Sequence, residues 1–520
     1  MNAARNPAEA NRILYIAAIV SSLVMLDSNV VAVALPTIAR SIGADFSALQ
    51  WVITAYVLPF AALLLAAGSW ADIYGRKKAI LLGQFIFALA SLLCGIATSP
   101  LLLNLARAVQ GIGASLLLTA ALAIINNEFQ GKERARAYAF WGSCLGIAIT
   151  CGPIIGGVIS NYWGWNWVFL INVPICAVLM FATQKIIPES KSPVAKKLDY
   201  AGVATFSVGL FLLTWAVIDG NALGWSSAAI SLRLAGGIVL LLLFVVVEGR
   251  QQDPMVDFSL LTTSRFTGSA LAMIGYAGGA QVMIFYLPVY LQKAYGYEPA
   301  AAGLAMLPFA LPMFLIPKVG ARLSAMISSK TILGMALAIT ASANLLMALV
   351  SVSDMSYGVF AAVMIWAGVG AGLLNSETAK ALQGAIPAER AGMASGVSAT
   401  VRFTGLLLSV AALGAVLAAT TSRLFSDRAA SLGLSPDAAR ELAKHFVAGE
   451  AAQAHAGGVD FSRYQDALRH AFDAGFASTS IGAALIAAVC LVLMYLIMPR
   501  EKDLPASARN DLNSVVVPGE

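Results

Sequence analysis

Long apolar stretches alternate with short polar breaks along almost the whole chain. Fourteen of these stretches can cross a hydrocarbon core of about 30 Å, which takes about 20 residues of helix. Within lipid each backbone polar group must find a partner in the protein, and no stretch alternates as the strands of a barrel do, so we predict helices. Their expected bounds are 13–35, 49–70, 79–98, 101–125, 136–160, 165–186, 199–218, 229–248, 266–293, 299–319, 330–350, 355–377, 393–421 and 475–498.

Composition supports this assignment. Of the 520 residues, 59% are hydrophobic and only 12% are charged, and the mean hydropathy is +0.79. Soluble domains carry about 25% charged residues, so a soluble protein is excluded and an all-α polytopic membrane protein is predicted. Residues 1–12 carry two arginines ahead of an apolar stretch that is longer than the 7 to 15 residues of a signal-peptide core. We therefore expect a retained first helix after a short N-terminal segment.

Most lysines and arginines fall in alternate polar breaks, including 76–78, 132–136 and 185–197. Cations gather in cytoplasmic loops, so both termini, including a tail at 499–520, are predicted to be cytoplasmic. The long segment 422–474 would then be an extracytoplasmic loop, and its sequence predicts two short surface helices, at 435–446 and 460–472. The formal charge of +6 is sorted by loop rather than gathered in one patch, and we expect no nucleic-acid partner.

A weak internal repeat divides the chain. A shift of 252 residues aligns Gly68 with Gly320 and Lys78 with Lys330. Two related six-helix halves explain this repeat. The two surplus helices then form an inserted pair, in an arrangement of six, two and six. The predicted units are an N-terminal bundle, the inserted pair and a C-terminal bundle at residues 13–186, 199–248 and 266–498.

A polar stretch, GSWADIYGRKK at 68–78, separates the second and third apolar segments. Asp72 precedes Arg76 by four residues, and Gly75 can adopt a positive φ in a tight turn. A membrane hairpin that follows the positive-inside rule would explain the charges alone. The order of Gly, Ala-Asp and Gly-Arg-Lys is more particular than charge placement requires.

Two charged side chains lie within predicted membrane helices of the first half. An unpaired carboxylate at the centre of such a helix costs about 2.5 to 3.5 kcal/mol, so Asp27 is a candidate proton site or a fixed structural hydrogen-bond acceptor. Arg107 keeps its proton and must find acceptors, so it either tunes a nearby carboxylate, with Asp27 as the candidate, or pins two helices together. The three histidines all lie within 422–474, so intramembrane protonation would use carboxylates.

Other candidates are less specific. Gly152, Pro153, Gly156 and Gly157 permit close helix packing and a kink in the fifth helix. The second half offers two charged candidates, Glu377 near a helix end and Arg402 within a helix. Aromatic and amide residues in apolar helices either pack or line a substrate pocket, and we select as pocket candidates Tyr56, Gln281, Tyr286, Tyr290, Trp366 and Asn375.

Four motifs together carry a family resemblance. The 68–78 stretch resembles the loop between helices 2 and 3 of the major facilitator superfamily. LDSNVVAVALP at 26–36, LNLARAVQGIGAS at 103–115 and GIAITCGPIIGG at 146–157 resemble signatures of its 14-spanner drug:proton antiporter branch, whose members include multidrug and quaternary-ammonium exporters. The sequence departs from the usual pattern at four positions, Asn29, Ala32, Trp70 and Ile73.

The resemblance implies roles for these residues. Asp27 and Arg107 would couple transport to protons, and the glycines and proline of the fifth helix would seal the path against leak and favour exchange. The 68–78 loop would hold cytoplasmic helix ends together in the outward-facing state, through Gly68, Asp72, Gly75, Arg76 and Lys77.

We therefore expect a proton-coupled exporter of amphipathic small molecules, such as drugs, antiseptics or toxic metabolites, in the bacterial inner membrane. A dedicated exporter of one natural product or toxin made by the host is the main alternative, ahead of an uptake symporter and of a receptor or channel with the same fold. An enzyme is disfavoured because the sequence shows no intramembrane histidine cluster, metal-ligand set or nucleotide loop. We expect no cofactor, metal or ATP, a proton gradient as energy source, the bilayer and a small-molecule substrate as partners, and a monomer.

Overall fold

The structure is a computed structural model. It describes residues 7–43, 46–129, 131–191, 199–251, 262–324, 326–353, 355–385, 391–429 and 464–498, together with 434–435, 438–439, 442–443 and 446. Throughout these residues the regular elements are helices, with no strand among them. The predicted cytoplasmic tail, 499–520, lies outside the described residues.

The helices fall into three consecutive groups. The first comprises α1 (Pro7–Ile42), α2 (Phe46–Tyr74), α3 (Arg76–Gly95), α4 (Pro100–Glu128), α5 (Gly131–Tyr162), α6 (Asn166–Leu170) and α7 (Asn172–Ile186). The inserted pair is α8 (Tyr200–Leu223) and α9 (Ala228–Arg250). The third comprises α10 (Ser264–Tyr276), η2 (Ala277–Gln281), α11 (Met283–Ala294), α12 (Pro299–Leu304), α13 (Leu307–Leu323), α14 (Ser329–Ser351), α15 (Tyr357–Gly384), α16 (Ala391–Ala429) and α18 (Gln465–Ile497).

Thirteen helices of the described residues are long and apolar enough to cross a membrane, and the bent α2 makes a fourteenth span. The predicted all-α fold is confirmed. Several helices run past the predicted bounds, as α1 does at both ends, from Pro7 to Ile42 rather than 13–35. Hydropathy marks only the part of a helix that matches the hydrocarbon core, whereas polar turns continue the same helix beyond it.

The predicted loop 422–474 is shorter in the structure. Its first residues continue α16 as far as Ala429, and α18 begins at Gln465. The prediction of a separate surface helix at 460–472 is therefore wrong, because residues from Gln465 form the first turns of α18. Of the other predicted helix, 435–446, the structure describes helical residues at 438–439, 442–443 and 446, and the rest lies outside the described residues.

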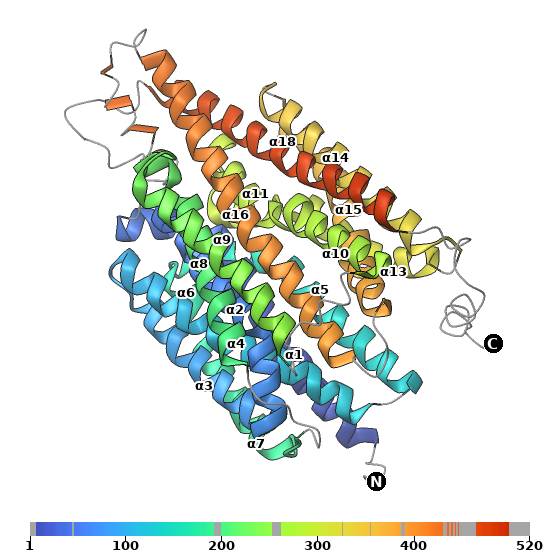
Figure 1. Ribbon diagram of the computed structural model, residues 1–520. Coiled ribbons are helices and arrows are strands. Elements are labelled where there is room, and N and C mark those ends of the chain that lie inside the picture. Colours follow the sequence, from blue (N-terminus) through green and yellow to red (C-terminus); the bar gives the residue numbers. More distant parts are fainter. Residues whose placement is uncertain are drawn as a thin grey trace.

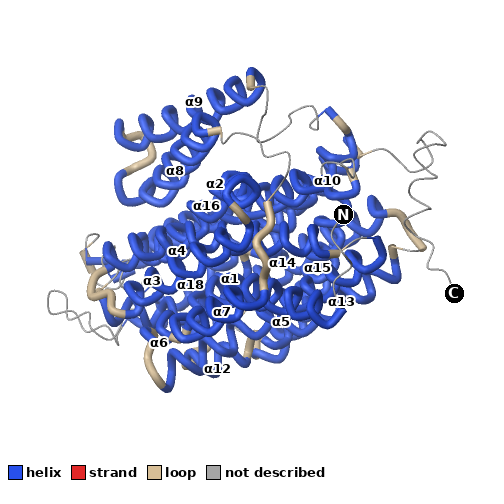
Figure 2. The backbone as a smooth tube through the Cα atoms, turned by 90° about the horizontal axis from the view of Figure 1, so that it is seen from below, coloured by secondary structure: helices blue, strands red, loops and turns tan. Residues whose placement is uncertain are grey.

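The inserted pair lies beside the junction of the two halves (Figures 1 and 2). Helix α8 packs on α2 of the first half and on α16 of the second, and α9 packs on α8. Asn221 on α8 donates a hydrogen bond to the carbonyl oxygen of Ala415 on α16, at 2.6 Å. Only 17% of the most apolar 18-residue stretch of α9 is buried. This helix therefore presents most of its apolar surface outward, as a lipid-facing helix does.

The two halves touch each other near the ends of α1 and α11. Gln292 Nε2 on α11 donates to the carbonyl oxygen of Val33 on α1 at 3.0 Å. A second contact between the halves joins α2 to α16, where Gln50 Nε2 lies 3.5 Å from the carbonyl oxygen of Val410. The cavity left beside Gln50, lined by Ile53 and Tyr286 among others, measures only about 30 Å³. This end of the bundle, which the charge pattern assigns to the outer face, is closed.

Close backbone contact between α5 and α12 contributes to this closure. A Cβ at Gly157 would overlap the carbonyl oxygen of Pro299, and a Cβ at Gly303 would overlap that of Pro153. Glycines at both positions let the two helices approach to a distance that no side chain would permit.

We predict that Gly157→Ala opens the closed end, because overpacking there costs about 1–3 kcal/mol. A cysteine at Ile53, in a chain stripped of its five native cysteines, reports the opening through its alkylation rate. The rate should rise several-fold. Gly142→Ala on the same helix is the matched control, since a Cβ there meets nothing within 4 Å. Equal rates in Gly157→Ala and the control would contradict the packing account.

Candidate functional site

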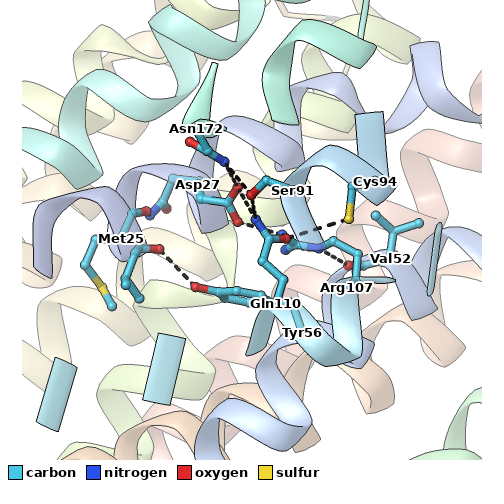
Figure 3. A network of polar contacts seen from close by, with 11 residues as sticks. Met25, Asp27, Val52, Tyr56, Ser91, Cys94, Arg107, Gln110 and Asn172 are labelled. Atoms are coloured by element: carbon cyan, nitrogen blue, oxygen red, sulfur yellow. Dashed lines mark hydrogen bonds and ion pairs between the residues drawn. The ribbon is translucent and has the colours of Figure 1, made fainter. Parts of the chain in front are cut away.

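The two embedded charges of the first half form a buried ion pair (Figure 3). Arg107 Nη1 on α4 lies 2.6 Å from Asp27 Oδ2 on α1, and the two side chains are 1% and 0% exposed. Sequence reasoning named Asp27 as the candidate partner of Arg107, and the structure shows this contact. Whether the pair couples transport to protons stays a prediction.

Arg107 is also fixed from the side of α2. Its Nε donates to the carbonyl oxygen of Val52 at 3.0 Å, and its guanidinium lies 4.1 Å from the ring centroid of Tyr56. A Cβ at Gly111 would overlap the carbonyl oxygen of Tyr56. Gly111, one turn after Arg107, therefore brings α4 close enough to α2 for both contacts. This contact gives a physical reason for the spacing of the arginine and the glycine.

Tyr56 belongs to this charge network. Its ring packs under the guanidinium, and its hydroxyl donates to the carbonyl oxygen of Val24 at 3.2 Å. The side chain is buried in the bundle, at 1% exposure. The sequence suggested a pocket residue here, whereas in this state Tyr56 stacks on the ion pair.

Three neutral side chains complete the surroundings of Asp27. Gln110 Nε2 and Asn172 Nδ2 both donate to Asp27 Oδ1, at 2.9 and 2.7 Å. Gln110 Nε2 also reaches Ser91 Oγ at 2.8 Å, and its Oε1 accepts from Arg107 Nη1 at 2.6 Å. Both oxygens of the carboxylate are thus occupied, and the network joins α1, α2, α3, α4 and α7.

Sequence reasoning missed Ser91, Gln110 and Asn172. A signal existed for two of them. Gln110 follows Arg107 by three residues and so shares its helix face. Asn172 interrupts an apolar segment, and a buried amide requires partners. Ser91 gives no such signal, because serines often bond back to their own helix.

The predicted gating loop is held by a local ion pair and a tight turn. Arg76 Nη2 lies 2.8 Å from Asp72 Oδ1. Gly75 has φ +125°, which L side chains rarely adopt, and a Cβ there would overlap the carboxylate of Glu189. Gly75 is therefore required by its conformation, whereas a Cβ at Gly68 would make only an ordinary contact, 3.8 Å from Thr119 Cβ.

The same loop docks on the end of α7 and on the residues that follow it. The Arg76 backbone N–H donates to the carbonyl oxygen of Ser190 at 2.9 Å, and the Lys77 backbone N–H to Glu189 Oε1 at 3.2 Å. Lys77 Nζ donates to the carbonyl oxygen of Gln184 at 2.7 Å. These bonds stay within the first half, so the gating role between halves stays a prediction for another state.

The glycines of the fifth helix face two different neighbours. A Cβ at Gly152 would lie 2.6 Å from Asn29 Cβ, and one at Gly156 would overlap the carbonyl oxygen of Val30. These two glycines hold α5 against α1 just past Asp27. Gly157 faces α12 of the second half, and Pro153 lies within α5 with its carbonyl oxygen toward the same helix.

Three second-half candidates converge. Arg402 Nε on α16 donates to Gln281 Oε1 at 2.8 Å, and its Nη2 donates to the hydroxyl oxygen of Tyr276 at 3.2 Å. The Tyr276 hydroxyl donates to Asn375 Oδ1 at 2.9 Å. Tyr276 was not among the residues selected from the sequence.

The remaining candidates lie apart from this cluster. Tyr286 donates to the carbonyl oxygen of Val410 at the closed end, and Tyr290 stacks on Phe476 with ring centroids 4.0 Å apart. Trp366 is 42% exposed. Glu377 is buried, at 1% exposure, with its Oε2 3.8 Å from Lys380 Nζ. Among the described residues no group of three or more His, Cys, Asp or Glu side chains could hold a metal.

Two bundles of membrane helices with a charge pair buried inside one of them define a polytopic membrane protein of the two-half type. The chain belongs to the Major Facilitator Superfamily, whose family model matches residues 17–410. Solved structures share the fold. A bacterial homolog of the human lysosomal transporter Spinster, in an inward-facing and unoccupied conformation, has a TM-score of 0.61 at 16% identity and covers 98% of this chain and 99% of its own.

Relatives of known name are more similar in sequence. The multidrug resistance protein Stp of Mycobacterium tuberculosis is 31% identical over 441 residues, which cover 84% of this chain and 81% of Stp. The multidrug efflux pump LfrA of Mycolicibacterium smegmatis is 30% identical over 483 residues, 93% and 95% of the two chains. The cephamycin export protein CmcT of Amycolatopsis lactamdurans is 33% identical over 430 residues, 82% and 88% of the two.

We predict that Asp27→Asn and Arg107→Met each destabilise the protein, and that the double variant loses less than their sum. Removing one member of a buried pair leaves the other uncompensated, at a cost of about 3–5 kcal/mol for a fully buried charge. The coupling energy should fall at about 0.5–3 kcal/mol. Unfolding of the four forms in detergent measures it, and additive losses would show that the two side chains do not act as a pair.

Proposed function

We propose that this protein is a secondary active transporter that exports amphipathic small molecules from the cytoplasm in exchange for protons. The carrying observation is the buried pair of Asp27 and Arg107, 2.6 Å apart among neutral donors. A carboxylate embedded in this way is a group that can take up and release a proton as water access changes. Relatives named as a multidrug efflux pump and a cephamycin export protein support the export direction.

Protonation of Asp27 is the proposed coupling step. A neutral carboxyl no longer balances the charge of Arg107, and one of its oxygens turns from acceptor to donor. A proton on Oδ2 would oppose the bond from Arg107, and a proton on Oδ1 would oppose the bonds from Gln110 and Asn172, so the network rearranges in either case. Because these side chains come from different helices, loss of the proton and gain of the proton favour different packings of the first half.

The packing beyond Asp27 offers a route from this site to the closed end. Asn29 and Val30, on the same helix α1, lie against Gly152 and Gly156 of α5. The next glycine, Gly157, touches Pro299 of the second half. We propose that movement of α1 on protonation loosens this contact and opens the outer face, while the 68–78 loop engages the second half at the inner face. An alternating transporter requires contacts of this kind, made in one state and broken in the other.

Export of one natural product is the second candidate. The relative CmcT is named for cephamycin export, and a further relative, 33% identical over 405 residues, is named as a probable actinorhodin transporter of Streptomyces coelicolor. In either case we propose a monomer in a bacterial inner membrane, with both termini in the cytoplasm, driven by a proton gradient without ATP or cofactor.

Inside-out vesicles with an acidic interior and a pH-sensitive dye test the proposal. The added compounds are lipophilic cations, neutral antibiotics and amphipathic organic acids. We predict that at least one of these classes releases protons in the wild type, and that Asp27→Asn abolishes this release. Asp219→Asn is the matched control, because Asp219 is also an ion-paired carboxylate, 2.8 Å from Arg233, but lies in the inserted pair. Immunoblots must show equal amounts of the three proteins.

Proton release that persists at the wild-type rate in Asp27→Asn would refute coupling at this residue. Release by one compound class only would favour the dedicated exporter over the multidrug transporter.

A further inference from the structure

Arg402 is a second arginine inside the membrane-spanning part, and its partners are neutral. It bonds to Gln281 Oε1 and to the Tyr276 hydroxyl oxygen, at 2.8 and 3.2 Å. In the part of the chain that the structure describes, no carboxylate is paired with it. Arg107 differs sharply, since a carboxylate lies 2.6 Å from its guanidinium. The charge of Arg402 is therefore solvated by dipoles and left uncompensated.

The guanidinium has donors to spare. It carries five N–H groups, of which the bonds to Gln281 and Tyr276 account for two. Its side chain is partly exposed, as is that of Asn375, which accepts from Tyr276. An intramembrane arginine is costly unless it meets a partner or a water-filled cavity. A planar guanidinium that has N–H groups left over and is partly exposed is suited to bind a carboxylate or another anionic oxygen.

A distortion of the backbone holds Gln281, whose Oε1 accepts from Arg402, in place. Residues Ala277–Gln281 form one π-turn, in which the Val282 N–H bonds to the carbonyl oxygen of Ala277 at 3.0 Å. Asn344 on α14 donates to the carbonyl oxygen of Gly279, inside this turn, at 2.8 Å. Such turns are frequent at functional sites. This one places the last residue of the turn, Gln281, against Arg402.

The cluster lies where the two halves meet. Phe403, the next residue after Arg402, packs edge-on against Phe60 of α2, with ring centroids 4.5 Å apart. Figure 1 shows α16 running between α10 of its own half and the first-half helices. The two partners of Arg402 come from α10 and η2, and Asn375, which is bonded to Tyr276, comes from α15. All three elements belong to the second half. A molecule that passes between the halves therefore meets this side of the second half.

Acidic side chains are scarce on the same side. Helices α10, α11, α13 and α14 contain no Asp or Glu, and α15 contains only Glu377, which is buried with Lys380 as its neighbour at 3.8 Å. A cationic molecule would find no carboxylate other than Glu377 on these helices, whereas an anionic one finds Arg402.

We propose that Arg402, oriented by Gln281 and Tyr276, binds the anionic oxygen of the exported molecule, and that the substrates are amphipathic organic anions such as carboxylates and ionised phenols. Asn375 supplies a further polar contact beside the anion. This inference rests on the proposed export function and narrows its substrate class.

Binding to the purified full-length protein in nanodiscs tests this proposal. The probes are fusidate, naproxen and indomethacin, each beside its neutral methyl ester, and the signal is quenching of the nine tryptophans after subtraction of empty nanodiscs. We expect the wild type to bind at least one acid about tenfold or more tightly than its ester, as a charge-assisted bond requires. Arg402→Gln should lose this preference, and Arg402→Lys should keep part of it.

Arg233→Gln is the matched control, because Arg233 is a membrane-helix arginine whose ion pair with Asp219 lies in the inserted pair. It should keep the wild-type preference. Equal binding of acids and esters by the wild type, binding of no acid, or an unchanged preference in a folded Arg402→Gln would each overturn the anion site. Gel filtration and thermal unfolding identify a variant that fails to fold. If Arg402→Gln fails to fold, the test is whether Arg402→Lys has a weaker preference for the acid over its methyl ester than the wild type has.

The vesicle assay separates failure of this inference from failure of the proposed function. If lipophilic cations release protons through Asp27 while no acid binds, export stands and the anion site is wrong. If acids bind through Arg402 while neither acids nor cations release protons, the site stands and proton exchange is wrong.

Discussion

A carboxylate and a guanidinium 2.6 Å apart, with almost no exposed surface, set the arrangement of the first half. In a low-dielectric interior such a pair is stable only when its remaining donors and acceptors are also satisfied. Gln110 and Asn172 meet this need at Asp27, and the Val52 carbonyl oxygen meets it at Arg107. Five spans are thereby tied to one carboxylate, so a change at Asp27 would be felt by all five helices.

Close backbone packing connects the surroundings of Asp27 to the second half. Glycines on α5 bring that helix against α1 near Asp27 and against α12 of the other half. The contacts leave no room for a methyl group, so small movements of α1 cannot be absorbed locally. The second half has a different character, since its embedded arginine, Arg402, is held by neutral oxygens. One half thus holds a neutralised charge pair, and the other presents an uncompensated cation.

Much of this was predictable from the sequence, for physical reasons that also explain the gaps. Hydropathy located all fourteen spans because lipid demands long apolar helices, but it could not place helix ends such as Ala429, where polar turns continue the helix. Embedded charges identified Asp27, Arg107 and Arg402, because such residues are too costly to be incidental. Neutral partners such as Ser91 and Tyr276 were not predicted, since only the packing of segments distant in sequence brings them to these charges. The π-turn before Val282 has no sequence pattern that we could read in advance.

The central claim is that Asp27 gains and loses a proton while the protein works. Infrared difference spectra of the protein in lipid, recorded between acidic and alkaline buffer, test it most directly. The account predicts a carboxyl C=O band in acid that is absent from Asp27→Asn and present in both Asp219→Asn and Glu377→Gln. An identical spectrum in wild type and Asp27→Asn would contradict it, because the buried pair would then be a fixed structural contact.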